Sequence, residues 1–463
     1  MKQHIHLIGI GGTGLSAIAR LLHESGYVVS GSDQSHGPLA DALARDGIAV
    51  YIGHRAENIA GADVIVRSSA VSADNPEVAA AIAAGIPVLK RSEFLGQLMR
   101  EKTVIAIAGT HGKTTTTGLT AYMLHQLGLD PSFIVGGTIQ QLGTNAHAGT
   151  GDFFVIEADE YDRMFLGLNP SLAVITYLEH DHPDIYPTFA EYRQAFFEFA
   201  SSIRAGGSAL VCGDQPELRA FSQELVSANI PCLTYGCEEW NDYQARNIRL
   251  SPEGFYTLDV WYQHAAHTAV LAYNVTLSLP GKHNIQNALA ALAAAHIQGV
   301  DMKDAAPHVA AFTGTGRRFE ITSVVNGITL IDDYAHHPTE IQTTLAAVRS
   351  RFQQARIYAI WQPHTYSRTR LLRTEFTHAF SQADQVFITE IYASREPKEE
   401  FSSRELVREM DPASTRYVNL YLEVIPVLTQ ELRPGDVVIV LSAGDAVEIN
   451  PRLAAELKGV SHA

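Results

Sequence analysis

The stretch 104–117, VIAIAGTHGKTTTT, decides the fold of this chain. An apolar, β-rich run leads into a turn between Gly109 and Gly112, and the residues from Lys113 onward favour a helix. Strand, glycine turn, lysine and threonine in this order are typical of a loop that binds phosphate at a helix N-terminus. Lys113 would reach the β- and γ-phosphates, and the hydroxyl of Thr114 would reach Mg²⁺. The stretch therefore predicts an ATP site.

The spacing of this turn departs from the usual phosphate-loop pattern, which has four residues between its glycines. Only Thr110 and His111 stand between the two glycines here. A plain glycine turn before a threonine-rich helix is the alternative, and the order of the four features makes it the weaker interpretation. We expect ATP contacts along the whole turn and the first helical residues: Gly109, Thr110, His111, Gly112, Lys113, Thr114 and Thr115.

Composition limits what kind of protein this is. The chain has 463 residues, 46% of them hydrophobic, which suits about three domains with cores of their own. Its 50 acidic residues outnumber the 34 Lys and Arg, giving a formal net charge of -16. This balance argues against a nucleic-acid partner, because phosphates need clustered cations. With three cysteines in no zinc pattern, no signal-peptide plan and no long apolar run, we expect a cytoplasmic enzyme without membrane insertion.

The first third of the chain predicts a nucleotide-binding fold. Residues 4–33 read as strand, glycine turn, helix and strand, with Gly9, Gly11 and Gly14 in a G-x-G-x-x-G fingerprint. Asp33 ends the second strand, where such folds commonly place an acid that contacts a ribose. These residues alone support three alternatives about equally: the turn binds NAD, it binds another nucleotide diphosphate, or it binds no ligand.

A further strand over 62–67 ends at the hydroxyls of Ser68 and Ser69. The ligand crevice of an open α/β sheet lies beyond the carboxyl ends of its strands, so these serines suit a ligand site. They could equally cap a helix. We expect the first domain to end near Arg100, before the ATP strand begins.

Two strands in the middle of the chain run into acidic clusters. Glu157 follows the strand 153–156, and the strand after a phosphate loop commonly ends in an acid that holds Mg²⁺. His182 follows the strand 172–177 in a cluster of histidines and acids that suits a second metal position. We expect this strand end to neighbour Glu157 in a parallel sheet. A solvated acidic loop and a packed surface histidine are the alternatives.

The next segments are an antiparallel excursion and a helix. Period-two patterning over 243–281 predicts antiparallel strands. The helix that follows carries Asn284 and Asn287 one turn apart on one face. Their amides suit the edge of an adenine, and helix capping by Asn284 is an equal alternative.

The last third predicts another α/β domain. It begins after a Gly- and Thr-rich link over 314–317, and this composition predicts a hinge. Arg317 and Arg318 stand at the end of this link. Four strands follow, and each ends in polar residues that would face a cleft. The cations among them compensate the acidic total where a charged substrate would lie. The polar strand ends include Asp332, Asp333, Tyr334, His336, His337, Gln362, His364, Tyr366, Ser367, Arg368, Glu390 and Arg395.

Taken together, these stretches resemble the Mur ligase family. GIGGTG, AGTHGKTTTT, EADEYD, HDHPD, GKHNIQNALAA, GRRFE, DDYAHHPTEI and QPHTYSRT occur in the family's order over essentially the whole chain. Several look most like the member that adds the first amino acid, L-alanine. The resemblance implies an α/β fold of three domains: a Rossmann-like domain over 1–100, a P-loop ATPase-like domain over 101–316 and a Rossmann-like domain over 317–463.

The resemblance also implies substrates and residue roles. The expected substrates are UDP-N-acetylmuramate, L-alanine and ATP, with Mg²⁺, in a monomer or homodimer. The expected substrate contacts are Gly11, Gly12, Thr13, Gly14, Asp33, His54, Ser68 and Ser69, joined by His336, His364 and Arg368. The metal residues would be Thr114, Glu157 and His182. The catalytic set would be Lys113, Glu157, His182, Arg318 and Asp333, the last two also near ATP, with Asn284 and Asn287 at the adenine.

Two features bear on the amine that such an enzyme would use. No lysine occurs between Lys113 and Lys282, so the carbamoylated lysine of several later ligases cannot come from that span. Tyr161 stands where alanine-adding members often carry Ser, and YASREP replaces a more usual Ala-Gly-Glu. That Tyr is also seen in the ligases that recycle murein peptides. The alternative function is therefore addition of a tripeptide to the same acceptor.

Overall fold

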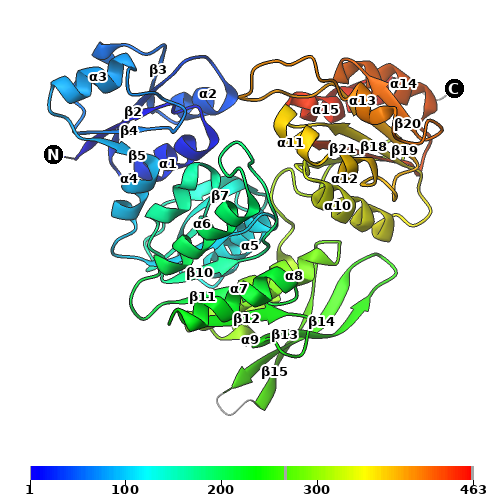
Figure 1. Ribbon diagram of the computed structural model, residues 1–463, viewed down its shortest axis with the longest axis horizontal. Helices are drawn as coiled ribbons and strands as arrows, with labels where there is room; N and C mark the ends of the chain where they lie inside the picture. The colour runs from blue at the N-terminus through cyan, green and yellow to red at the C-terminus, as the bar shows by residue number, and fades with distance from the viewer. Residues whose placement is uncertain (1, 265–267, 460–463) are drawn as a thin grey trace.

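The computed structural model describes residues 2–264 and 268–459, which form three α/β units, each built on its own sheet. In Figure 1 the N-terminal and C-terminal units lie in the two upper corners, and the central unit lies below them. This arrangement confirms the predicted α/β fold of three domains. No helix in the described part of the chain combines the length and apolarity needed to cross a bilayer.

The N-terminal unit has a five-stranded parallel sheet in the order β3-β2-β1-β4-β5. The order reverses between β1 and β4, and this reversal is where open α/β sheets bind ligands. The strands are β1 (His4–Ile8), β2 (Val28–Asp33), β3 (Ala49–Ile52), β4 (Val64–Arg67) and β5 (Val88–Lys90). The helices are α1 (Thr13–Glu24), α2 (Pro38–Arg45), α3 (Pro76–Ala83) and α4 (Arg91–Leu98).

The central unit has a ten-stranded sheet in the order β15-β14-β13-β12-β11-β10-β6-β9-β7-β8. Its strands are β6 (Thr103–Ala108), β7 (Ser132–Ile139), β8 (Thr144–His147), β9 (Phe153–Glu157), β10 (Leu172–Ile175), β11 (Ser208–Cys212), β12 (Cys232–Gly236), β13 (Tyr243–Leu250), β14 (Tyr256–His264) and β15 (Thr268–Thr276). Its helices are α5 (Lys113–Gln126), α6 (Phe189–Ser201), α7 (Pro216–Ser227), α8 (His283–Ile297) and α9 (Met302–Ala311). The antiparallel pairing of β13, β14 and β15 confirms the excursion, except at 265–267, which lie outside the described residues.

One expectation about this sheet is wrong. β10 does not pair with β9, because β6 lies between them and is parallel to both. The strand that enters the phosphate turn thus takes the centre of the sheet. The turn separates the end of β10 from Glu157 at the end of β9, and the two acidic clusters lie on either side of it.

The C-terminal unit has a six-stranded sheet in the order β16-β17-β21-β18-β19-β20, parallel except for β16. Its strands are β16 (Glu320–Val325), β17 (Ile328–Asp333), β18 (Ile357–Gln362), β19 (Gln385–Thr389), β20 (Thr415–Val418) and β21 (Val437–Ser442). Its helices are α10 (Pro338–Arg351), α11 (Tyr366–Leu371), α12 (Arg373–Thr377), α13 (Arg404–Val407), α14 (Val424–Glu431) and α15 (Ile449–Gly459). The inner strands are buried along their length, since helices cover both faces of such a sheet.

Candidate active site

The turn between β6 and α5 packs so closely on its neighbours that it needs glycine. Gly109 and Gly112 have φ values of 134° and 83°, in the region that favours glycine. A Cβ at Gly109 would lie 2.2 Å from Thr176 Oγ1, and one at Gly112 would lie 2.6 Å from Asn287 Oδ1. The turn is therefore fixed between the end of β10 and helix α8, at the N-terminus of α5.

Lys113 begins helix α5 and is largely buried. Its Nζ donates to Glu160 Oε1 at 2.8 Å and to the carbonyl of Gly109. Burial alone would lower the pKa of the Lys113 ammonium, but the carboxylate of Glu160 outweighs it and the net direction is upward. Lys113 therefore carries a positive charge at the start of the helix, where a phosphate would bind.

Thr114 and Glu157 are brought together across the turn. Thr114 Oγ1 donates to Glu157 Oε1 at 3.0 Å, and Glu157 Oε2 accepts from the backbone N–H of Gly136 at 2.7 Å. Burial raises the pKa of Glu157, and the charge of Lys113 opposes that shift. A hydroxyl and a half-buried carboxylate are hard oxygen donors, and this pair fits Mg²⁺.

His182 lies on the other side of the turn. Its Nε2 is 3.9 Å from Glu160 Oε1 and 3.8 Å from Asp181 Oδ2. Its ring packs edge-on against Tyr161, with centroids 5.2 Å apart. The described contacts link His182 to Glu160 rather than to Glu157, as the central position of β6 requires. Glu160 therefore connects Lys113 with the predicted second metal residue.

The C-terminal unit reaches this region through Arg368. Its Nε and Nη2 donate to Asp181 Oδ1 at 2.9 and 2.7 Å, and both side chains are buried. His364 Nδ1 lies 3.1 Å from Arg368 Nη1. Burial, together with the charges of His336 and Arg368, lowers the pKa of His364 to about 2, so this imidazole is neutral. Two predicted substrate residues, His364 and Arg368, thus contact each other, and the guanidinium of Arg368 is bound to Asp181.

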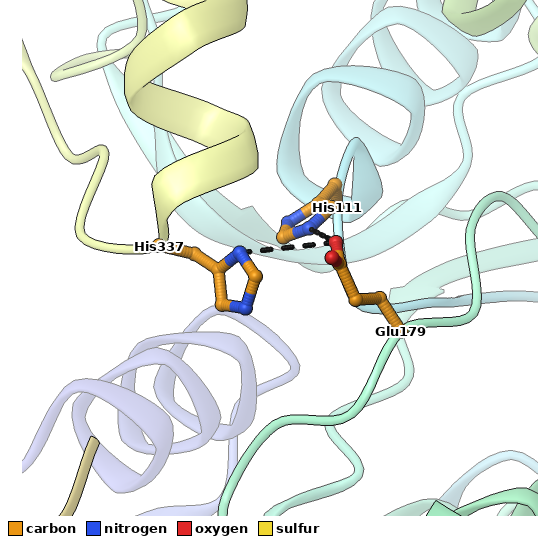
Figure 2. A group of neighbouring side chains, drawn as sticks. All are labelled: His111, Glu179 and His337. Atoms are coloured by element: carbon orange, nitrogen blue, oxygen red, sulfur yellow. Dashed lines mark hydrogen bonds and ion pairs between the residues drawn. The ribbon is translucent and has the colours of Figure 1, made fainter. Parts of the chain in front are cut away.

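His111 of the phosphate turn and His337 of the C-terminal unit both approach Glu179 (Figure 2). The Nε2 of His111 is 3.0 Å from Glu179 Oε2, and its Nδ1 is 3.2 Å from Glu340 Oε1. His337 Nδ1 lies 3.8 Å from the same Glu179 oxygen. Burial alone would lower the pKa of His111, but the two carboxylates raise it to about 9. His111 is therefore an imidazolium that bridges two domains, and neither of its acidic partners is among the predicted residues.

Arg318 and Asp333 lie beside this bridge. Asp333 accepts from the backbone N–H groups of Phe319 and Ala335 at 2.7 and 2.8 Å, and burial raises its pKa to about 6. Arg318 Nη1 is 3.9 Å from Glu340 Oε1. The carboxylate of Asp333 thus holds the loop that carries Arg318, and contact of either residue with ATP stays a prediction.

Predicted contacts in the N-terminal unit gather at the carboxyl ends of β1 and β2. The N–H of Gly11 donates to Asp33 Oδ2 at 2.8 Å. His54 Nδ1 lies 3.0 Å from the hydroxyl of Ser32. Ser68 also approaches, since a Cβ at Gly9 would lie 3.1 Å from its Cβ. The residues therefore surround the start of α1, as the fingerprint indicates.

Two residues of this unit were missed. Arg91 follows β5 and pairs with Asp159 of the central unit at 3.1 Å, and its guanidinium also covers Gly14, the third fingerprint glycine. Its position directly after a strand is a signal that could have identified it. Glu77 is fully buried and accepts from Ser32 at 2.5 Å, which places it behind His54.

The side-chain amides of the two asparagines of α8 form hydrogen bonds within the protein. Asn287 Nδ2 donates to Asn284 Oδ1 at 2.9 Å, and Asn284 Nδ2 donates to the carbonyl of Pro280 at 2.7 Å. Thr116 in α5 donates to Asn287 Oδ1 at 3.3 Å. Asn287 therefore supports the phosphate turn, and the adenine role of both residues stays a prediction.

Three family models match consecutive parts of the chain. They are described as the Mur ligase family catalytic domain, over residues 4–103, the Mur ligase middle domain, over 107–295, and the Mur ligase glutamate ligase domain, over 317–444. The matches follow the order of the three sheets.

Similar proteins and structures include L-alanine ligases and a murein peptide ligase. The chain is 41% identical to a UDP-N-acetylmuramate–L-alanine ligase of Chromobacterium violaceum, with 98% of each chain covered. It is 39% identical to one of Syntrophus aciditrophicus, over 99% of this chain and 94% of the relative. A UDP-N-acetylmuramate–alanine ligase structure from Thermotoga maritima matches with a TM-score of 0.80 at 28% identity, covering 98% and 99% of the two chains. A murein peptide ligase structure from Psychrobacter arcticus matches over the full length of both chains, with a TM-score of 0.72 at 27% identity.

Proposed function

Since the chain belongs to the Mur ligase family, we propose that it joins L-alanine to UDP-N-acetylmuramate in an ATP-dependent reaction of peptidoglycan synthesis. The observation that carries the proposal is that the C-terminal unit contacts the central unit next to the positively charged phosphate turn. Lys113 at the start of α5 pairs with Glu160, which lies 3.9 Å from His182, and the preceding residue, Asp181, holds Arg368 of the C-terminal unit. Relatives about 40% identical over nearly the full length carry the name of this activity.

The first step activates a carboxylate. A lactyl carboxylate oxygen of UDP-N-acetylmuramate attacks the γ-phosphorus of ATP, the new O–P bond forms, and the bond to the β-phosphate breaks to release ADP. The ammonium of Lys113 and the N–H groups at the start of α5 stabilise the charge on the transferred phosphoryl group. The product is an acyl phosphate.

Thr114 and Glu157 are the residues that would hold Mg²⁺, since their oxygen donors suit it, and His182, on the other side of the turn, would belong to a second metal position. When bound, the ion supplies positive charge that neutralises phosphate oxygens. The chain itself supplies the half-buried Glu157 carboxylate, which the N–H of Gly136 orients toward Thr114.

The second step captures the acyl phosphate. The amine nitrogen of L-alanine attacks the carbonyl carbon, the C–N bond forms, the C–O bond to phosphate breaks, and the amine gives up a proton. Contacts across the domain boundary, such as Arg368 with Asp181 and His111 with Glu340, would keep water away from the intermediate. Positioning of reactants from three domains supplies much of the rate.

Addition of a tripeptide is the second candidate, favoured by Tyr161 in the acidic loop. It has weaker support, because the murein peptide ligase structure matches with the lower TM-score and the curated relatives named above are L-alanine ligases. Phosphate release with ATP and UDP-N-acetylmuramate, measured with L-alanine and then with the murein tripeptide, separates the two. We expect release with L-alanine, and release with the tripeptide alone would refute the assignment. A cytoplasmic monomer or homodimer belongs to the same proposal.

A further inference from the structure

The cations around the phosphate turn differ in whether a carboxylate already neutralises them. Five are paired: Lys113 with Glu160, Arg91 with Asp159, Arg163 with Glu198, Arg318 with Glu340, and Arg368 with Asp181. Arg395 differs from them. Among the residues that the structure describes, it forms no ion pair, and it lies against the ring of Tyr161.

Arg395 belongs to the C-terminal unit but lies over a residue of the central unit. Its Cζ is 4.1 Å from the centroid of the Tyr161 ring. The hydroxyl of Tyr161 donates to Asp184 Oδ2 at 3.2 Å, and its ring packs against His182. A single aromatic ring therefore separates Arg395 from the predicted metal residue beside Lys113.

The backbone around Arg395 is held in place. The carboxylate of Glu396 accepts from the N–H groups of Tyr366 and Ser367 at 2.5 and 3.1 Å. On the other side, the carbonyl of Tyr392 accepts from the N–H of Thr365 at 3.0 Å. The loop thus presents Arg395 from a fixed base, which limits the entropy lost when its guanidinium binds a ligand.

The position of Arg395 leaves its guanidinium able to bind an anion. Its side chain is exposed and its Cζ lies over the Tyr161 ring, so N–H donors of the planar guanidinium stay accessible. A carboxylate is the group that matches this edge with two parallel hydrogen bonds. The reaction supplies one, since a free amino acid carries its carboxylate on the carbon next to the attacking nitrogen.

We propose that Arg395, held by Tyr161, binds the α-carboxylate of the incoming amino acid. The inference rests on the proposed function and extends it to specificity. In a peptide donor, the carboxylate next to the attacking amine is consumed in a peptide bond, so Arg395 has no partner there. Arg395 therefore selects a single amino acid over a peptide.

The test compares L-alanine with its neutral analogue L-alaninamide in phosphate-release assays. The wild-type enzyme should have a much lower KM for L-alanine than for the amide. Arg395→Gln should raise the KM for L-alanine roughly 10- to 100-fold, the effect of losing hydrogen bonds to a charged group. Its KM for L-alaninamide, ATP and UDP-N-acetylmuramate should stay within about twofold, since none of them offers that carboxylate. Arg395→Lys, which keeps the charge, should retain part of the preference.

Arg404→Gln is the matched control, because Arg404 stacks on Tyr417 within the C-terminal unit, 4.6 Å from Cζ to centroid. It should leave every KM unchanged. A wild-type preference for L-alanine over the amide that survives in Arg395→Gln would overturn the proposal for Arg395 alone. A wild-type enzyme that releases phosphate with the tripeptide and not with L-alanine would overturn the proposed function as well.

Discussion

Arg368 of the C-terminal unit donates two hydrogen bonds to the same oxygen of Asp181 in the central unit, across 187 residues of sequence. Asp181 directly precedes His182, so this contact ties the closing domain to the strand end beside the phosphate turn. Arg368 outweighs the effect of burial and holds the pKa of the Asp181 carboxyl well below its usual range. The pair is charged at every pH at which the protein would be assayed.

Breaking this pair should uncouple the two domains. Asp181→Asn and Arg368→Gln each leave a buried charged group without its partner, which costs about 3–5 kcal/mol. A double-mutant cycle on kcat/KM should show strong coupling between the two positions. Arg370 pairs with Glu399 in a more exposed setting, and the same cycle there should give less than about 1 kcal/mol. Additive effects at Asp181 and Arg368 would show that the contact does not matter for the reaction.

Lys113 should be essential to phosphoryl transfer. Lys113→Ala removes the charge that faces the transferred group, and the loss in kcat should be at least about 100- to 1000-fold. Formation of ADP, followed with all three substrates present, measures it. Lys102→Ala is the control, because the side chain of Lys102 donates only to the carbonyl of Gly151 in the described contacts, and this variant should keep its activity. Normal ADP formation by Lys113→Ala would refute the ATP site.

Glu157 should set the magnesium requirement. Glu157→Gln keeps the hydrogen-bonding shape but removes the negative charge, so the Mg²⁺ concentration for half-maximal rate should rise at least about tenfold. Thr114→Ser, which keeps the hydroxyl, should change it little. Titration of the rate with MgCl₂ at saturating substrates provides the measurement. An unchanged requirement in Glu157→Gln would place the ion elsewhere.

His111 predicts a pH dependence of stability in the protein without nucleotide. Its pKa is raised from 6.5 to about 9, so its bridge to Glu179 and Glu340 is fully present below pH 6.5. That contribution is lost as the pH rises through about 9. The Tm of wild type should therefore exceed that of His111→Gln at pH 6.5, and the gap should close by pH 10. A gap independent of pH would show that His111 is not charged in the bridge.

Local chemistry made the phosphate turn and the three α/β units predictable. Gly109, Gly112 and Lys113 specify their turn within five residues, and strands that end in polar groups mark a crevice wherever they occur. The order of the strands was not predictable in the same way. The position of β6 between β9 and β10 depends on packing across the whole sheet, and it removed the expected contact of His182 with Glu157.

The contact partners of the predicted residues could not be predicted from the sequence either. His111 meets Glu179 and Glu340, which are 68 and 229 residues away. The contact with Glu340 forms only where the C-terminal unit meets the central one, and the contact with Glu179 depends on β10 lying next to β6, so no local spacing records either. The position of Arg91 after a strand could have marked it as a candidate, but its partner Asp159 belongs to the next unit and was not predictable from local sequence. The sequence thus predicted which residues line the crevice, and the structure added the contacts that join the units around it.

The central claim is that a carboxylate is activated at the Lys113 turn before an amine captures it. UDP-N-acetylmuramate labelled with heavy oxygen in its lactyl carboxylate, incubated with the enzyme, ATP and L-alanine, tests this claim directly. Mass spectrometry of the released phosphate should find one labelled oxygen in each molecule, because the acyl phosphate leaves with an oxygen from the substrate. Phosphate without label, formed together with the amide product, would contradict the account.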